Sequence, residues 1–360
     1  MNTHPGSELD ISIIDALQLN PRADWAELAG ALCHSPKTLA RKWSALSERG
    51  LAWIAIGPGP AFVRYGCAAF LVVNCRPHAK REVAAALIAE AAVVSVSATS
   101  GEADFLVDAF APSLDDLSQL LSERIETIDG IVSVTTLVAL ATYREGSRWR
   151  VQALDLQQSA LLTRPQAGAP RRSGPSLDDL DRLLLEALSR DGRQPWTDLA
   201  DRCGTSGPTA RRRVGKMIDS GRIALRCEGA TALVGPIVPT TFMISVPPDE
   251  VNRVGEVLGR IPKCRVLEAI TGPSNMLLTM WFRSTAEIAP FESALARELP
   301  SLVIADRFVS LRTYKRGGHI LDAEGRSTAL IPLASIFSGR IDRAAAGATG
   351  ALSSKAGTEV

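Results

Sequence analysis

A basic segment in the second half of the chain reads Ser206-Gly207-Pro208-Thr209-Ala210-Arg211-Arg212-Arg213-Val214-Gly215-Lys216-Met217. It holds four basic residues and no acidic one. At about 100° per residue, a helix here would gather four apolar side chains on one side, namely Ala210, Val214, Met217 and Ile218. Its opposite side would carry Thr209, Arg212 and Lys216. Ser206 is a typical N-cap residue and Pro208 suits a first turn. The pattern predicts a helix that packs through one face and presents positive charge on the other.

Two further helices are predicted immediately before this basic helix. Residues 177–189 carry leucines at helical spacing, residues 196–203 suit a short helix, and Gly204-Thr205 suits a tight turn. Three helices with a glycine-containing turn before a basic third helix are typical of helix-turn-helix DNA-binding domains. The alternative is an amphipathic surface helix whose arginines are only solvated. The agreement between charge and turn placement favours DNA binding.

The same pattern occurs near the N-terminus at a constant offset of 171 residues. The matched pairs are Trp25 with Trp196, Ser35 with Ser206, Thr38 with Thr209, Arg41 with Arg212, Gly50 with Gly221 and Gly101 with Gly272. The first basic helix has Lys37, Arg41 and Lys42, but Trp43 stands where the second has Val214, and Ala45 where it has Lys216. We infer two copies of one unit whose DNA-binding helices have diverged.

Each helical unit precedes a segment in which strand and helix patterns follow the order β-α-β-β-α-β. In the first copy the ranges are 68–75, 80–91, 93–99, 104–109, 114–125 and 131–143; in the second they are 241–246, 250–261, 265–271, 275–282, 285–298 and 302–314. This order is typical of a ferredoxin-like sandwich with an antiparallel sheet. The expected fold class is therefore α+β, with two winged-helix-like helix-turn-helix domains, each followed by a ferredoxin-like domain.

These patterns divide the chain into seven segments. We expect a disordered tail at 1–8, helix-turn-helix domains at 9–57 and 177–228, sheet domains at 66–146 and 238–320, a helix and flexible linker at 147–176, and a disordered tail at 333–360. A short helix is expected within residues 149–162. Arg171 and Arg172 in the linker could touch phosphates, but solvated linker charge is the simpler interpretation.

Composition limits the function to that of a soluble modular protein. The net charge of the 360 residues is only +1, whereas residues 171–227 hold 12 basic and 8 acidic residues. Such a local excess argues against non-specific coating of DNA but not against a modular DNA-binding protein. The six cysteines lack metal-site spacing, so neither a metal nor a cofactor is expected. No apolar run is long enough to span a bilayer, which predicts a cytoplasmic protein without a membrane partner.

The order, spacing and duplication of these motifs resemble the Lrp/AsnC (feast/famine) family of transcription regulators. The residues that carry the resemblance are Leu180-Asp181-Arg182, Ser206-x-x-Thr209-x-x-Arg212-Arg213-Val214, Gly221-x-Ile223, and Gly101-Glu102-Ala103-Asp104. The resemblance extends from Leu9 to about Lys315, a range that holds both copies of the unit. It implies a non-enzymatic regulator whose sheet module, called RAM, mediates dimerisation and binds a small effector, commonly an amino acid.

The resemblance also implies that the Gly-x-x-Asp turn lies near the effector site. A glycine allows a tight turn that exposes backbone N–H groups to a carboxylate, and an aspartate can pair with an ammonium group. The candidate effector residues are Gly101 and Asp104, with Gly272 and Asn275 in the second copy. Because Asn275 replaces the acid, the second site should bind an ammonium group weakly. The alternative is that all four are only turn residues.

The expected partners are double-stranded operator DNA, a small effector and further copies of the chain, joined through the RAM modules. The candidate DNA-binding residues are Lys37, Thr38, Arg41, Lys42, Ser206, Thr209, Arg211, Arg212, Arg213 and Lys216. Arg212, Lys216 and Thr209 are expected to face the major groove, with Arg211 and Arg213 beside phosphates. The protein is expected to be associated with the nucleoid.

Two other functions remain open. Siroheme decarboxylases resemble Lrp/AsnC proteins and occur as paired or fused copies, but they would require histidines and arginines in the sheet module. The four histidines, His4, His34, His78 and His319, do not match across the repeat. The other alternative is a ligand-binding or assembly protein that has lost DNA binding. Trp25 and Trp196 are interpreted as packing residues rather than ligand-stacking ones.

Overall fold

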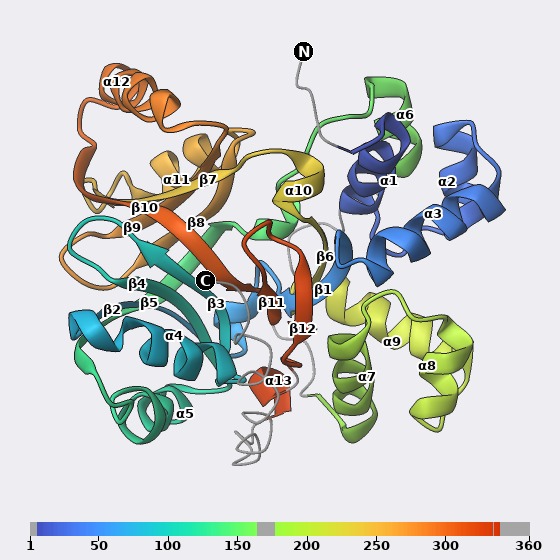
Figure 1. Ribbon diagram of the computed structural model, residues 1–360, viewed down its shortest axis with the longest axis horizontal. Coiled ribbons are helices and arrows are strands. Elements are labelled where there is room, and N and C mark those ends of the chain that lie inside the picture. Colours follow the sequence, from blue (N-terminus) through green and yellow to red (C-terminus); the bar gives the residue numbers. More distant parts are fainter. Residues whose placement is uncertain (1–5, 164–176, 334, 339–360) are drawn as a thin grey trace, which may run out of the picture.

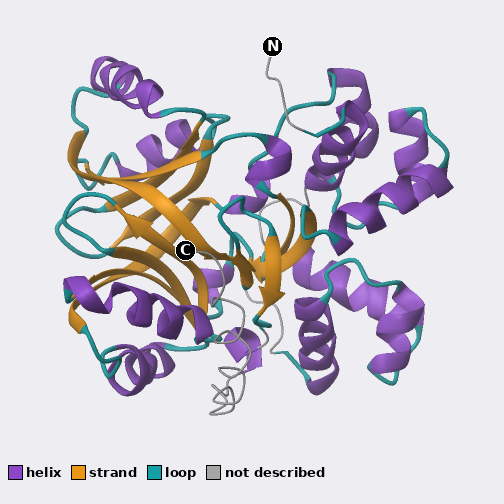
Figure 2. Cartoon of the chain, in the orientation of Figure 1, coloured by secondary structure: helices purple, strands orange, loops and turns teal. Residues whose placement is uncertain are grey.

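The computed structural model describes residues 6–163, 177–333 and 335–338. Two helical units lie side by side, and curved strands with outer helices form the other half of the molecule (Figures 1 and 2). The predicted α+β class, with two helix-turn-helix units and two ferredoxin-like units, is confirmed. Of the predicted tails at 1–8 and 333–360 and the predicted linker, residues 1–5, 164–176, 334 and 339–360 lie outside the described residues. Two parts of the predicted disordered tails are instead helical, since Glu8 begins a helix and Ser335–Ser338 form a short one.

The helical units, here called heads, repeat one another element by element. The first head contains α1 (Glu8–Leu19), α2 (Trp25–Leu32), α3 (Pro36–Glu48) and β1 (Ala52–Pro58); the second contains α7 (Asp179–Arg190), α8 (Trp196–Arg202), α9 (Gly207–Asp219) and β6 (Ile223–Gly229). The two heads are joined because β1 pairs antiparallel with β6, from Ala52 opposite Gly229 to Pro58 opposite Ile223. Each head therefore contributes one strand to a shared two-stranded sheet.

The sheet modules have the predicted β-α-β-β-α-β order. The first contains β2 (Cys67–Cys75), α4 (Lys80–Ala89), β3 (Val93–Thr99), β4 (Phe105–Ala111), α5 (Leu114–Gln119) with a π-helical continuation (Leu120–Ile125), and β5 (Ile131–Arg144). The second contains β7 (Val238–Ser245), α11 (Val251–Gly259), β8 (Cys264–Ile270), β9 (Met276–Phe282), α12 (Ile288–Glu298) and β10 (Val303–Arg316). The mostly apolar strands alternate between a face under these helices and a face toward the other module.

The two long last strands join the modules. The start of β5 pairs with β2 and its end pairs with β8, while β10 pairs first with β7 and then with β3. The strand order β3-β4-β2-β5-β8-β9-β7-β10 thus closes on itself through the β10–β3 pairing. Between the sheets lies a small apolar cluster drawn from both modules, including Phe70, Leu106, Met243 and Phe308. Each module therefore covers the open face of the other, as two fused copies should.

The remaining elements connect heads and modules. They are α6 (Leu156–Leu162), α10 (Thr231–Val234), β11 (His319–Leu321), β12 (Ser327–Leu330) and α13 (Ser335–Ser338). The helix predicted within residues 149–162 is confined to α6, because residues 149–155 run irregularly over α1. The β11–β12 hairpin, absent from the sequence-based prediction, extends the sheet beyond β10. In the described part of the chain, no helix is long and apolar enough to cross a membrane.

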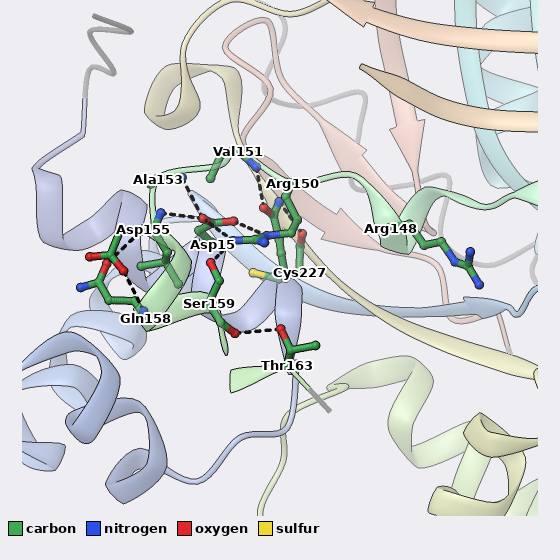
Figure 3. A network of polar contacts seen from close by, with 12 residues as sticks. Asp15, Arg148, Arg150, Val151, Ala153, Asp155, Gln158, Ser159, Thr163 and Cys227 are labelled. Atoms are coloured by element: carbon green, nitrogen blue, oxygen red, sulfur yellow. Dashed lines mark hydrogen bonds and ion pairs between the residues drawn. The ribbon is translucent and has the colours of Figure 1, made fainter. Parts of the chain in front are cut away.

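The segment before α6 is fastened to the first head by a buried carboxylate (Figure 3). Asp15 of α1 is fully buried and pairs with Arg150, whose Nε and Nη2 each lie 2.8 Å from its carboxylate oxygens. The backbone N–H groups of Ala153 and Leu154 donate to the same carboxylate at 2.7 and 2.9 Å. A buried charge needs such partners, so this contact fixes where the chain leaves the first sheet module.

Candidate nucleic-acid interface

Helix α9 presents three of its four cations to solvent. Ala210, Val214 and Met217 are buried in the head, whereas Arg211, Arg212 and Lys216 are exposed. Within the described ranges, Arg213 is the one α9 cation that forms an ion pair. The predicted division into an apolar and a cationic face is present, with one exception. Ile218, expected on the buried face, is 38% exposed because it lies in the last turn, beyond the packing of the head.

The serines and threonines of the candidate set begin the two helices. Ser206 Oγ accepts from the Thr209 N–H at 3.4 Å and donates to Thr209 Oγ1 at 2.9 Å. In the first head, Ser35 accepts from the Thr38 N–H at 3.1 Å. These side chains satisfy backbone donors that every helix N-terminus leaves open. Thr38 and Thr209 are half-buried, and the hydroxyl of each contacts the capping serine of its helix.

Arg213, expected beside phosphates, and Lys42, a candidate DNA-binding residue, both form ion pairs within their own heads. Arg213 Nη1 lies 2.6 Å from Asp178 and 2.9 Å from Asp181, at the start of α7. Lys42, its counterpart in the repeat, lies 2.8 Å from Asp10. Each cation is held by the first helix of its own head and would have to break an ion pair to reach DNA.

The recognition helix of the first head, α3, carries less exposed charge. Lys37 and Arg41 are exposed, whereas Trp43 is buried at the place that Val214 holds in α9. Ala45 is exposed where α9 has Lys216. Electrostatic attraction for DNA should therefore be weaker at the first head than at the second.

A reciprocal contact joins the two heads, and the sequence-based prediction missed it. Arg22 donates to the carbonyls of Gly192 and Gln194 at 2.9 and 2.8 Å, and its guanidinium lies 3.6 Å from the Trp196 ring centroid. Arg193, 171 residues later, donates to the carbonyls of Pro21 and Ala23 at 2.7 Å and lies 4.1 Å from the Trp25 ring centroid. The signal was present in the sequence, since both the arginines and the tryptophans match across the repeat.

This contact, here called the head lock, fixes one head against the other. Both guanidiniums are partly buried, and burial lowers the pKa of each, with about 10 for Arg22 and about 10 for Arg193. Each still has two carbonyl acceptors and an aromatic face. The tryptophans thus serve as packing residues between heads.

The four candidate effector residues lie at the tips of the β3–β4 and β8–β9 hairpins. Gly101 and Gly272 have φ of 88° and 111°, a conformation that favours glycine. Asp104 Oδ2 accepts from the Cys75 N–H at 2.9 Å, and Oδ1 lies 2.5 Å from Lys80 Nζ. Although partial burial opposes it, Lys80 and this N–H hold the pKa of Asp104 below its usual value.

Asn275 makes the equivalent contact with backbone atoms. Its Oδ1 accepts from the Val246 N–H at 3.1 Å, and its Nδ2 donates to the Val246 carbonyl at 2.7 Å. Each tip also touches the other module, since the Ser100 N–H donates to the Val309 carbonyl and the Thr271 N–H to the Val138 carbonyl, both at 2.9 Å. The structure therefore gives Asp104 and Asn275 a part in the fold, as the turn-residue interpretation expects.

Comparison with known proteins agrees with this architecture. The family model of the Lrp/AsnC ligand binding domain matches residues 68–149, and that of the AsnC-type helix-turn-helix domain matches residues 177–218. The chain thus carries both domain types of the Lrp/AsnC family. It is 28% identical over 120 residues to an uncharacterised HTH-type transcriptional regulator of Pyrococcus abyssi, covering 32% of this chain and 73% of the relative. It is also 28% identical over 118 residues to the HTH-type transcriptional regulator LrpA of Pyrococcus horikoshii, covering 31% and 81%.

A solved structure resembles the chain over nearly its whole length. The siroheme decarboxylase NirDL superposes with a TM-score of 0.54 and 14% identity, covering 92% of this chain and 97% of that one. At this identity the likeness concerns the fold alone.

Between the sheets and heads, the chain also buries charged groups that sequence reasoning missed. Glu228 of β6 pairs with Arg265 and, at 3.4 Å, with Arg316. Glu268 accepts from the Thr142 hydroxyl at 3.1 Å, and burial raises its pKa to about 8. No periodicity reveals such pairs, because their members come from elements far apart in the sequence.

Proposed function

We propose that the protein is a sequence-specific, double-stranded-DNA-binding regulator in which one chain supplies both DNA-reading heads. Arg212 and Lys216 would contact base edges, Arg211 would contact phosphate, and Lys37 and Arg41 would act in the first head. In this proposal the heads and the sheet modules are separate domains with the boundaries expected from the sequence. The site of action is the nucleoid in the cytoplasm.

The observation that carries the proposal is the head lock. It supports a rigid pair of heads, and exposed cations lie on the third helix of each. Two linked heads of a helix-turn-helix protein engage half-sites about one helical turn apart, ~34 Å. Because α3 and α9 differ in charge, we expect an asymmetric operator with a stronger half-site for α9.

Effector binding and assembly complete the proposal, and each has its own support. The hairpin tips at Gly101 and Gly272 are exposed, so their backbone N–H groups would receive the carboxylate of a small effector such as an amino acid. Asp104 and Asn275 would support these tips rather than contact the ligand. The long strands expose matched apolar side chains, namely Val132 and Leu140 in β5 and Val303 and Leu311 in β10. Such exposed apolar residues favour homo-oligomerisation through the modules.

The test is a salt series of DNA titrations with a fragment upstream of the protein's own gene. Arg212→Ala should weaken specific binding by roughly 1–3 kcal/mol and reduce discrimination against random DNA. Arg297→Ala, an exposed arginine on α12 far from the heads, is the matched control and should leave binding unchanged. Equal affinity of both variants and the wild type at every salt concentration would exclude this assignment.

A second candidate is tetrapyrrole chemistry, favoured by the fold likeness to NirDL, which has also been crystallised with an iron-uroporphyrin III analogue. It ranks second because the likeness carries no residue-level support. An absorbance titration with iron-uroporphyrin III tests it directly. Saturable binding, together with no preference for any DNA, would make this the better assignment.

A further inference from the structure

A pocket of about 510 Å³ lies between the two heads. The first head contributes residues of α2, α3 and β1, the second contributes the end of α7 and the loop after it, and the β11 strand contributes His319. Its size is typical of small-molecule sites, which often lie at the junction of structural units. It is separate from the hairpin tips and from the exposed cations of α9.

The lining is unusually rich in rings, which are contributed by Trp25, Trp43, Trp53 and His319. His319 stacks on Trp53 with 5.0 Å between ring centroids, and its Nδ1 lies 2.7 Å from Ser327 Oγ. Burial lowers the pKa of His319 to about 4, so this ring is neutral at pH 7. Trp53 is buried, and among the described residues no acceptor pairs with its indole N–H. A ring-lined pocket of this kind favours a planar aromatic ligand.

The repeat provides an internal comparison for these rings. At the offset of 171 residues, Val214 stands for Trp43, Ala224 for Trp53 and Arg148 for His319. Trp25 does have a matching tryptophan, which the head lock uses. The other half of the molecule therefore builds the same head without three of the four rings. Head folding alone does not require them, and a ligand that uses them would explain why they occur on one side.

The charged groups of the pocket balance. Arg190 and Arg193 face Asp191 and Glu48, so the lining has no net charge. Arg193 is already committed to the head lock, and the Arg190–Glu186 ion pair is 3.6 Å long and exposed. A charged ligand would be attracted by one sign and repelled by the other, so the lining would not compensate the cost of removing its charge from water. This arrangement favours a molecule without net charge, either neutral or zwitterionic.

We propose that this pocket between the heads binds a small planar heteroaromatic molecule without net charge. Because both heads line the pocket, such a ligand would hold their relative position and stabilise the folded chain. The binding claim does not depend on the proposed DNA-binding function, since it can be measured without DNA.

The experiment is isothermal titration calorimetry of the full chain with four probes that share one ring. Indole and L-tryptophan have no net charge at pH 7, whereas tryptamine is a cation and indole-3-acetate an anion. We expect saturable binding of the first two with Kd below about 1 mM, and weaker binding of both charged probes. An increase in Tm with indole or L-tryptophan should accompany binding.

Two substitutions locate the site. Ser47→Ile places on an exposed position of α3 the residue that α9 has there, Ile218, and should block the pocket without disturbing the core. Trp43→Val installs the matching residue of the second head and should weaken binding roughly 5- to 100-fold, as expected when one ring is removed from a stacking site. Ser118→Ile, on exposed α5, is the control and should bind as the wild type does.

The outcomes are distinct from those of the DNA titration. Binding lost in Ser47→Ile and retained in Ser118→Ile would establish the site, whatever the DNA result. No saturable heat with either uncharged probe would overturn the proposal. Equal affinity in the wild type and Ser47→Ile would do so as well, because the probe would then bind elsewhere.

Discussion

Single buried carboxylates decide how this fold responds to pH, and Glu268 is the clearest case. Burial raises its pKa to about 8, and loss of hydration raises that of neighbouring Asp108 to about 6. An unfolded glutamate titrates near 4.5. Between these values the folded chain keeps a proton that the unfolded chain releases, so the free energy of unfolding falls as pH rises from about 4.5 to 8.

We expect Glu268→Gln to flatten that decline. The amide can still accept from Thr142 but does not ionise, so the variant should be more stable than the wild type at pH 8. The difference should be about 1.4 kcal/mol for each unit by which the pKa of Glu268 in the folded chain exceeds that in the unfolded chain. Urea unfolding at pH 5, 6, 7 and 8 measures the difference. A variant with the same pH slope as the wild type would show that Glu268 is already ionised in the native state.

At the scale of elements, the two heads are alike in their helices but differ in how they are attached. Asp15 of α1 holds the segment before α6, whereas its repeat counterpart, Glu186 of α7, is exposed and pairs, within the described residues, with Arg190 alone. The attachment of the first head should therefore depend on one buried carboxylate, and that of the second should not.

Substitution of these two acids tests whether only the first head depends on a buried carboxylate for its attachment. Asp15→Ala removes one partner of a buried ion pair and also the acceptor for two backbone N–H groups. This loss should cost about 3–5 kcal/mol of unfolding free energy. Glu186→Ala should change it by less than about 0.5 kcal/mol. Urea denaturation gives both values, and limited proteolysis should show faster cleavage near residues 150–163 in the first variant. A loss in Asp15→Ala as small as that in Glu186→Ala would refute this account.

The elements themselves could be predicted from local signals, whereas several side-chain roles could not. Helical spacing, N-cap serines and the constant repeat offset place α3 and α9 correctly. The destination of Arg213 depends on where α7 lies in space, which no window of sequence encodes. For the same reason, the ion pair between Asp104 and Lys80 could not be predicted. The β11–β12 hairpin was missed because the corresponding residues of the first copy, 148–159, form no hairpin and so offered no repeat to guide the prediction.

At the scale of the whole molecule, the closed ring of strands leaves matched apolar residues outside. Leu140 of β5 and Leu311 of β10 are 60% and 69% exposed. They belong to the two modules, whose inner faces already cover each other. Their outer position offers a symmetric surface for a second chain.

The double substitution Leu140→Glu and Leu311→Glu should reduce the proposed homo-oligomer to single chains. Like charges at such an interface repel one another, while the exposed positions leave the core of each module intact. Light scattering coupled to gel filtration would measure the mass, with circular dichroism as the folding control. If the variant and the wild type have the same mass, these residues do not mediate assembly. This holds whether that mass corresponds to one chain or to several.

The proposed function requires that one chain hold two DNA-binding heads at a fixed separation. In vitro selection from a random DNA library measures this directly, using the wild type and the double variant Arg22→Ala, Arg193→Ala, which removes the head lock. The wild type should enrich two unequal half-sites centred about 10 base pairs apart, and the variant should enrich the same half-sites with variable spacing. If the wild type enriched a single half-site, or no sequence at all, the two heads would not be a fixed pair of DNA-binding units.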